Sequence, residues 1–148
     1  MMDIPLHRMG IVPGDKILVD VLNEASRLLQ MKGWSRFAMA RSACGEAISL
    51  NSADACSYCL SGAVVKAWRT IDPKNEDLYF PLFEKKFSAA LRNAYGYEGG
   101  VSRWNDEVAG SRDDVVTLIN SVIASIQPAA CSCQPGSWVC QRDAADLP

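Results

Sequence analysis

The chain has 148 residues, of which 49% are apolar and 22% charged, and its net charge is −2. A chain of this length and composition forms one globular domain whose core needs neither a metal nor a disulfide. The charge balance argues against binding to nucleic acid, which requires an excess of Lys and Arg, and no apolar run of about 20 residues predicts a membrane span. The first residues lack the regions of a secretory signal, so we expect a cytoplasmic protein with reduced cysteines.

Four segments have the apolar period of amphipathic helices. They cover residues 15–32, 53–71, 76–95 and 112–126. Gly33 follows the first segment, at a position where helices commonly end. Ser111 and Asp114 form a near capping box at the start of the fourth segment. These signals predict a mainly α-helical protein with four principal helices.

The stretch from Phe37 to Ile48 lacks a helical period. Its apolar residues flank a Ser-Ala-Cys-Gly turn, which predicts a short β-hairpin at about residues 36–49, between the first two helices. A lone hairpin is only marginally stable, so we expect it to pack on the helices. The predicted organisation is a single helical domain over residues 1–128, followed by an irregular, cysteine-containing tail at residues 129–148.

Cysteines are the first candidate site. Cys56 and Cys59 have C-x-x-C spacing, and Cys131 and Cys133 could complete a set of four thiolates for one zinc ion. However, Cys56 lies on the apolar stripe of the predicted second helix and Cys59 lies at its edge. Because free cysteine packs as a small hydrophobic residue, we interpret both as core residues. A zinc site and a redox pair are the alternatives.

A second candidate is the Trp104-Asn105-Asp106 segment before the fourth helix. In a structural interpretation, Trp104 closes the end of the bundle while Asn105 or Asp106 accepts bonds from backbone N–H groups. In a functional interpretation, the segment forms a polar cleft with Cys59 nearby. We favour the structural one. Trp138, in the tail, either docks on the bundle or contacts a partner.

The order of these features resembles a family of small uncharacterised proteins, a domain of unknown function found in bacteria and their phages. The likeness runs from about residue 17 to residue 126 and is carried by C-x-x-G-A and W-N-D motifs. Here these motifs are Cys59, Gly62 and Ala63, and Trp104-Asn105-Asp106. The resemblance implies that a four-cysteine zinc site would be private to this chain, and it implies no activity. A face of small residues at Cys59, Gly62 and Ala63 would let another segment approach closely.

We therefore expect a non-enzymatic, cytoplasmic protein-interaction module that binds a partner protein and no cofactor, nucleic acid or membrane. Whether it forms a homo-oligomer is left open. The first alternative is a zinc-binding protein that uses the four cysteines named above. The second is a small-molecule binder or enzyme that uses the Trp104-Asn105-Asp106 segment.

Overall fold

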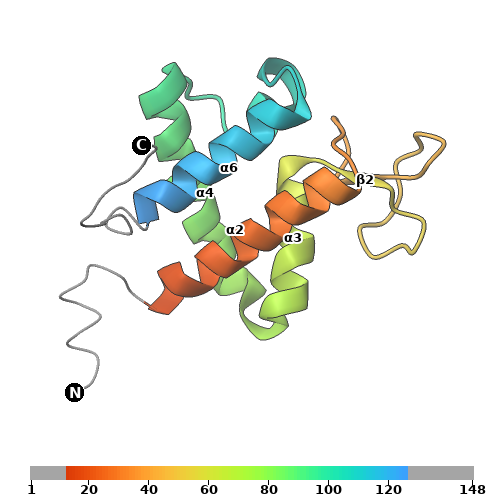
Figure 1. Cartoon of the computed structure of the whole chain (residues 1–148), viewed down its shortest axis with the longest axis horizontal. Coiled ribbons are helices and arrows are strands. Elements are labelled where there is room, and N and C mark those ends of the chain that lie inside the picture. Colours follow the sequence, from red (N-terminus) through yellow and green to blue (C-terminus); the bar gives the residue numbers. More distant parts are fainter. Residues whose placement is uncertain (1–12, 127–148) are drawn as a thin grey trace, which may run out of the picture.

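The computed structural model describes residues 13–126, in which helices surround an apolar core and a small sheet lies at one end (Figure 1). The described residues contain five α-helices: α2 (Pro13–Met31), α3 (Leu60–Ile71), α4 (Glu76–Tyr95), α5 (Val101–Arg103) and α6 (Arg112–Ile126). A 3₁₀ helix, η1 (Pro73–Asn75), precedes α4, and a π-helix, η2 (Trp104–Val108), follows α5. The sheet pairs β1 (Ala40–Arg41) with β2 (Ser57–Tyr58) in antiparallel orientation.

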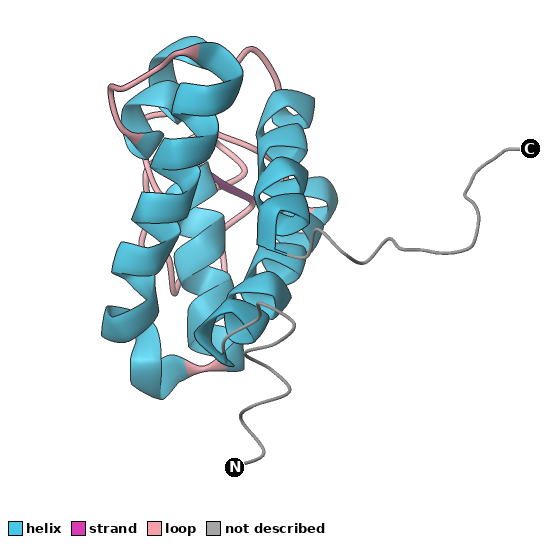
Figure 2. Ribbon diagram, turned by 90° about the vertical axis from the view of Figure 1, so that its left-hand side faces the viewer, coloured by secondary structure: helices cyan, strands magenta, loops and turns pink. Residues whose placement is uncertain are grey.

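The core lies where α2 packs against α3 and α6, with α4 in contact with α3 and α6. Figure 2 shows the helices side by side, joined by loops. At its centre Trp68 of α3 meets the edge of Phe83 at a centroid distance of 6.1 Å, and Phe83 packs on Phe87 at 4.6 Å. These aromatic pairs add to the apolar area that drives folding. No helix within residues 13–126 has the length and apolar character needed to cross a membrane.

The sequence pattern predicted three of the helices closely. The bounds of α4 and α6 are those predicted, and α2 differs from its prediction by two residues or fewer at each end. The near capping box forms in part, because Asp114 accepts a bond from the Gly110 N–H and not from that of Ser111. Ser111 Oγ accepts a bond from the Asp114 N–H at 3.2 Å, while Asp114 Oδ2 accepts one from the Gly110 N–H at 2.8 Å. The mainly helical fold class is therefore confirmed.

The predicted start of the second helix, at residue 53, is wrong. Helix α3 begins at Leu60, and the preceding residues form turns and β2. The Cys56 N–H donates to the Arg41 carbonyl at 2.8 Å, and the Tyr58 N–H donates to the Gly33 carbonyl at 3.1 Å. Because these donors pair with other segments, a helix cannot form there. Cys56 therefore lies outside the helix, and its side chain is exposed rather than in the core.

The predicted hairpin and helix count are correct only in part. Ala40–Arg41 does contact the following segment, through an antiparallel bridge from Arg41 to Ala47, but its partner in the sheet is β2. The prediction of four helices omits the short helix α5. Residues 104–106, expected as a loop between helices, lie in the π-helix η2, which continues directly from α5.

Candidate functional site

Asn105 is the centre of a hydrogen-bond network that joins η2 to α3 and to the segment after α2. Its side chain is 1% exposed. Oδ1 accepts bonds from Trp34 Nε1 at 2.7 Å and from the Leu60 N–H at 3.0 Å. Nδ2 donates to the Ser35 carbonyl at 3.2 Å and to Asp106 Oδ1 at 2.9 Å. An amide offers two acceptor and two donor positions, so this buried group is fully paired.

The first turn of α3 is capped by two different side chains. Leu60 begins the helix, so its N–H has no partner within α3, and Asn105 supplies one from η2. Cys59 is the N-cap residue, and its Sγ accepts a bond from the Gly62 N–H at 3.2 Å. Burial raises the pKa of the Cys59 thiol, which keeps the thiol protonated at neutral pH. Cys59 is therefore a buried capping residue, with a protonated sulfur that is a weak nucleophile.

Gly62 lets the chain before β1 lie directly on α3. A Cβ atom at this position would be 2.1 Å from the Met39 carbonyl oxygen, closer than real Cβ contacts come. The same carbonyl accepts a bond from the Cys59 N–H at 3.3 Å. The expected close approach of another segment to the small residues of this helix is therefore confirmed at Gly62.

Asp106 holds Phe37 in a strained backbone conformation. Phe37 has a φ of 64°, and within residues 13–126 it is the one non-glycine residue with a positive φ. For an L-residue this conformation costs about 1–2 kcal/mol. The Phe37 N–H donates to Asp106 Oδ1 at 2.8 Å, while the residue is 67% exposed. A polar contact thus fixes a backbone that presents an aromatic ring to solvent.

A cavity of about 310 Å³ opens beside this network, and we call it the Phe37 groove. Its lining comes from the segment before β1, the start of α3, α4, α5 and η2: Phe37, Ala38, Met39, Cys59, Ser61, Phe80, Ser102 and Asp106. Phe37 and Met39 are 67% and 42% exposed and form the rim, whereas Cys59 and Ser61 are buried and form the base. The hydroxyl oxygens of Ser61 and Ser102 are 3.3 Å apart. The groove thus combines an apolar rim with a polar base.

The structure separates the roles within the Trp104-Asn105-Asp106 segment. Trp104 is 1% exposed and packs on Tyr95 with ring centroids 5.8 Å apart. Asn105 lies behind the groove, and only Asp106 of the three lines it. Both Asn105 and Asp106 accept hydrogen bonds from backbone N–H groups, as the structural interpretation expects. Asp106 and Cys59 nevertheless meet at one cavity, as in the functional interpretation.

Comparison with family models matches residues 14–125 to a family of unknown function (DUF6197). The chain belongs to this family. The match spans the whole Phe37 groove, so the groove is part of the DUF6197 domain. Comparison with curated proteins and with solved structures gives no match. That the two motifs recur in DUF6197, and that its members come from bacteria and phages, stay predictions.

Sequence reasoning missed the rim of the groove. Phe37 and Met39 lie in the stretch predicted as a hairpin, and Phe80 lies in the third predicted helix, where it is only partly buried. Ser61 and Ser102 carried no motif.

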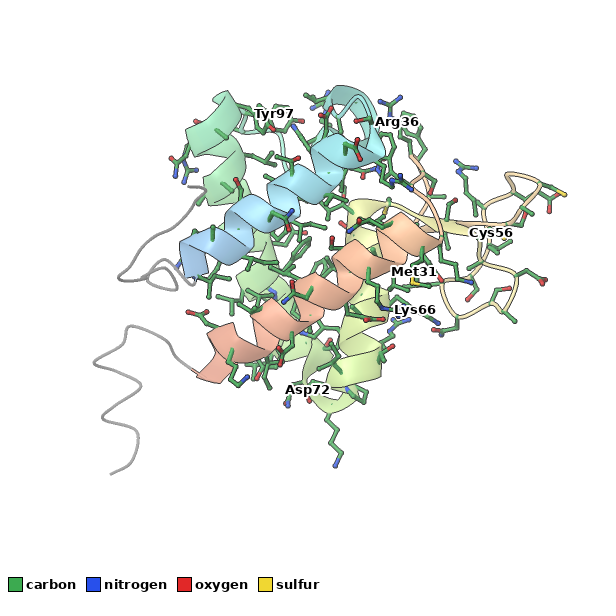
Figure 3. All side chains as sticks on the ribbon, viewed as in Figure 1. Met31, Arg36, Cys56, Lys66, Asp72 and Tyr97 are labelled. Carbon is green, nitrogen blue, oxygen red and sulfur yellow. The ribbon has the colours of Figure 1, made fainter. Side chains whose placement is uncertain are left out.

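The four-cysteine zinc site stays a prediction. Figure 3 shows Cys56 beside β2, where its side chain is exposed, whereas Cys59 is buried at the start of α3. Cys131, Cys133 and Trp138 lie outside the described residues. Within residues 13–126, no three His, Cys, Asp or Glu side chains are grouped in a way that could hold a metal ion.

Proposed function

We propose that this domain is a non-enzymatic protein-interaction module that binds a segment of a partner protein in the Phe37 groove. The observation that carries the proposal is the exposed apolar rim of the groove, where Phe37 is 67% and Met39 42% exposed. Exposed apolar side chains beside a cavity are typical of binding surfaces. With about 310 Å³, the cavity lies at the lower end of the range for small-molecule sites. That volume favours one or two side chains of a segment over a whole cofactor.

Backbone strain beside the groove supports a binding role. A phenylalanine at a φ of 64° is unfavourable, and such residues cluster at functional sites. The π-helix η2, which provides Asp106, is likewise a rare element that is frequent at functional sites. Both features adjoin the same cavity. Two departures from ordinary backbone geometry, linked by the bond from the Phe37 N–H to Asp106, thus coincide with the exposed rim.

The chemistry of the base supports binding rather than catalysis. Cys59 is the strongest candidate nucleophile in the groove, but its sulfur already accepts the Gly62 N–H. Its raised pKa also keeps the thiol protonated. Nucleophilic catalysis needs a thiolate or an adjacent base. We accordingly assign Cys59 to the capping of α3.

The proposed setting is the cytoplasm of a bacterium or a phage-infected cell. The bacterial or phage origin follows from the resemblance described above. The cytoplasmic location is proposed from the first residues of the sequence, which lack the pattern of a secretory signal, and reduced cysteines are consistent with it. Among residues 13–126, Cys44 and Cys56 are exposed and form no disulfide, and free thiols persist in a reducing compartment. The proposed partner is a protein and not nucleic acid, because the net charge of −2 gives no attraction to phosphates.

Selection from a phage library of random dodecapeptides tests the proposal. The full-length protein is immobilised, and recovered peptides are measured against the wild type, Met39→Ser and Leu78→Ser. Leu78 is 66% exposed and lies outside the groove, so its variant is the matched control. We expect peptides that bind the wild type and Leu78→Ser and lose affinity for Met39→Ser. Recovery of no peptides, or of peptides that bind all three proteins equally, would contradict the proposal.

A further inference from the structure

Asp106 has one carboxylate oxygen engaged and one free. Oδ1 accepts bonds from the Phe37 N–H at 2.8 Å and from Asn105 Nδ2 at 2.9 Å. Oδ2 has no hydrogen-bond or ion-pair partner among residues 13–126. Asp106 is half-buried, and it is the one charged side chain in the lining of the groove. The groove therefore contains a fixed negative charge with an open acceptor.

Neither Arg36 nor Arg41 pairs with Asp106. Arg36 donates to the Ala109 carbonyl, and its guanidinium lies 4.9 Å from the centre of the Trp34 ring. Figure 3 shows Arg36 at the end of the bundle where the chain enters α6. Arg41 donates to the Arg36 and Gly45 carbonyls. Within the described part of the chain, no cation neutralises Asp106.

Arg103 precedes η2 by one residue and is also paired. Its Nε lies 3.0 Å from Glu107 Oε1. An unpaired carboxylate beside an apolar rim is thus complementary to a ligand that is both cationic and apolar. Charge complementarity specifies the cation, and the rim of Phe37 and Met39 specifies the apolar part.

We infer that the partner segment carries an arginine or lysine side chain that pairs with Asp106 Oδ2, next to an apolar side chain that packs on Phe37 and Met39. The inference rests on the proposed function and names the chemistry of the partner. Arginine fits best, since its planar head group has five donors. The guanidinium N–H groups that do not bind Asp106 can donate to the hydroxyl oxygens of Ser61 and Ser102, which line the same cavity.

The test uses peptides recovered from the random dodecapeptide library and a double-mutant cycle. On the protein side, Asp106→Asn removes the charge but keeps an oxygen to accept the Phe37 N–H. On the peptide side, citrulline replaces arginine and removes the charge with little change of shape. We expect recovered groove-binding peptides to contain Arg or Lys. For an arginine peptide, either change should weaken binding about fivefold or more, and both together no further.

Different outcomes separate this inference from the proposed function. Peptides that lose affinity for Met39→Ser but lack a cation, and bind Asp106→Asn as tightly as the wild type, would overturn the inference and leave the function standing. Recovery of no groove-dependent peptide would overturn both. If Asp106→Asn fails to fold, the ion pair can still be tested by comparing the affinities of the arginine and citrulline peptides for the wild-type protein. Equal affinity of the arginine and citrulline peptides would then reject the ion pair.

Discussion

Removal of the Asn105 side chain is the sharpest test of how the groove is built. Asn105→Ala deletes two bonds accepted by Oδ1 and two donated by Nδ2. The Leu60 N–H is buried and loses its partner outright, which costs about 1–3 kcal/mol. Trp34 and Ser35 are half-buried and recover part of their bonding from water, so each contributes about 1 kcal/mol. We therefore expect Asn105→Ala to lower the free energy of unfolding by about 3–5 kcal/mol.

Urea denaturation followed by circular dichroism measures this loss directly. The midpoint should fall strongly while the slope with denaturant stays unchanged, because the same surface is exposed on unfolding. Asn120→Ala is the matched control, since Asn120 is an exposed residue of α6. It should change the free energy of unfolding by less than about 0.5 kcal/mol.

Asn105→Asp separates hydrogen bonding from simple loss of volume. The new carboxylate would place a second negative charge beside Asp106 and an oxygen against the Ser35 carbonyl. Both effects favour protonation of the new group, so its folded-state pKa is raised. The variant should therefore regain stability relative to the wild type as the pH falls below about 5. An Asn105→Ala variant within about 1 kcal/mol of the wild type would refute this account of the network.

Three further predictions concern neighbouring residues. Gly62→Ala should lower the free energy of unfolding by about 2–3 kcal/mol, because the new Cβ clashes with the Met39 carbonyl. Ala normally stabilises a helix relative to Gly, so a rise in the melting temperature would contradict the clash. Phe37→Gly should be more stable than Phe37→Ala by about 0.5–1 kcal/mol, because glycine adopts a positive φ without strain. If urea denaturation shows Phe37→Ala to be the more stable variant, a positive φ at this position is excluded. Burial raises the Cys59 pKa, so the unfolded state loses its proton first and wild-type stability falls above about pH 9. The Cys59→Ser variant keeps a capping oxygen, and its stability should fall less over that pH range. If the free energy of unfolding of both proteins has the same pH dependence, the raised pKa of Cys59 is contradicted.

Periodicity could predict the helices whose stability comes from local signals and one apolar face. The third and fourth predicted helices have capping residues and a clear stripe of buried residues, such as Phe83, Phe87 and Ile119. These features depend on residues close together in sequence, so a single sequence contains them. The bounds of α4 and α6 were accordingly correct.

The start of α3 could not be predicted in the same way, because distant residues determine it. Residues 53–59 fit the helical period, yet the Cys56 N–H pairs with Arg41 and the Leu60 N–H pairs with Asn105. Sequence separations of 15 and 45 residues leave no local signal. The same applies to Phe37, whose backbone N–H is held by Asp106, a residue distant in sequence. Cys59, Asn105 and Asp106 could therefore be singled out from the sequence, whereas the two serines of the base and the apolar rim could not.

The most direct test of the central claim is nuclear magnetic resonance of the ¹⁵N-labelled full-length protein, titrated with the tightest peptide from the selection. If the Phe37 groove is the binding site, the largest amide shifts will occur at residues 37–39, 59–61 and 102–106. They should be absent when Met39→Ser is titrated and retained for Leu78→Ser. Largest shifts outside the groove, such as around Ile71 and Leu78, would contradict the assignment of the groove as the binding site.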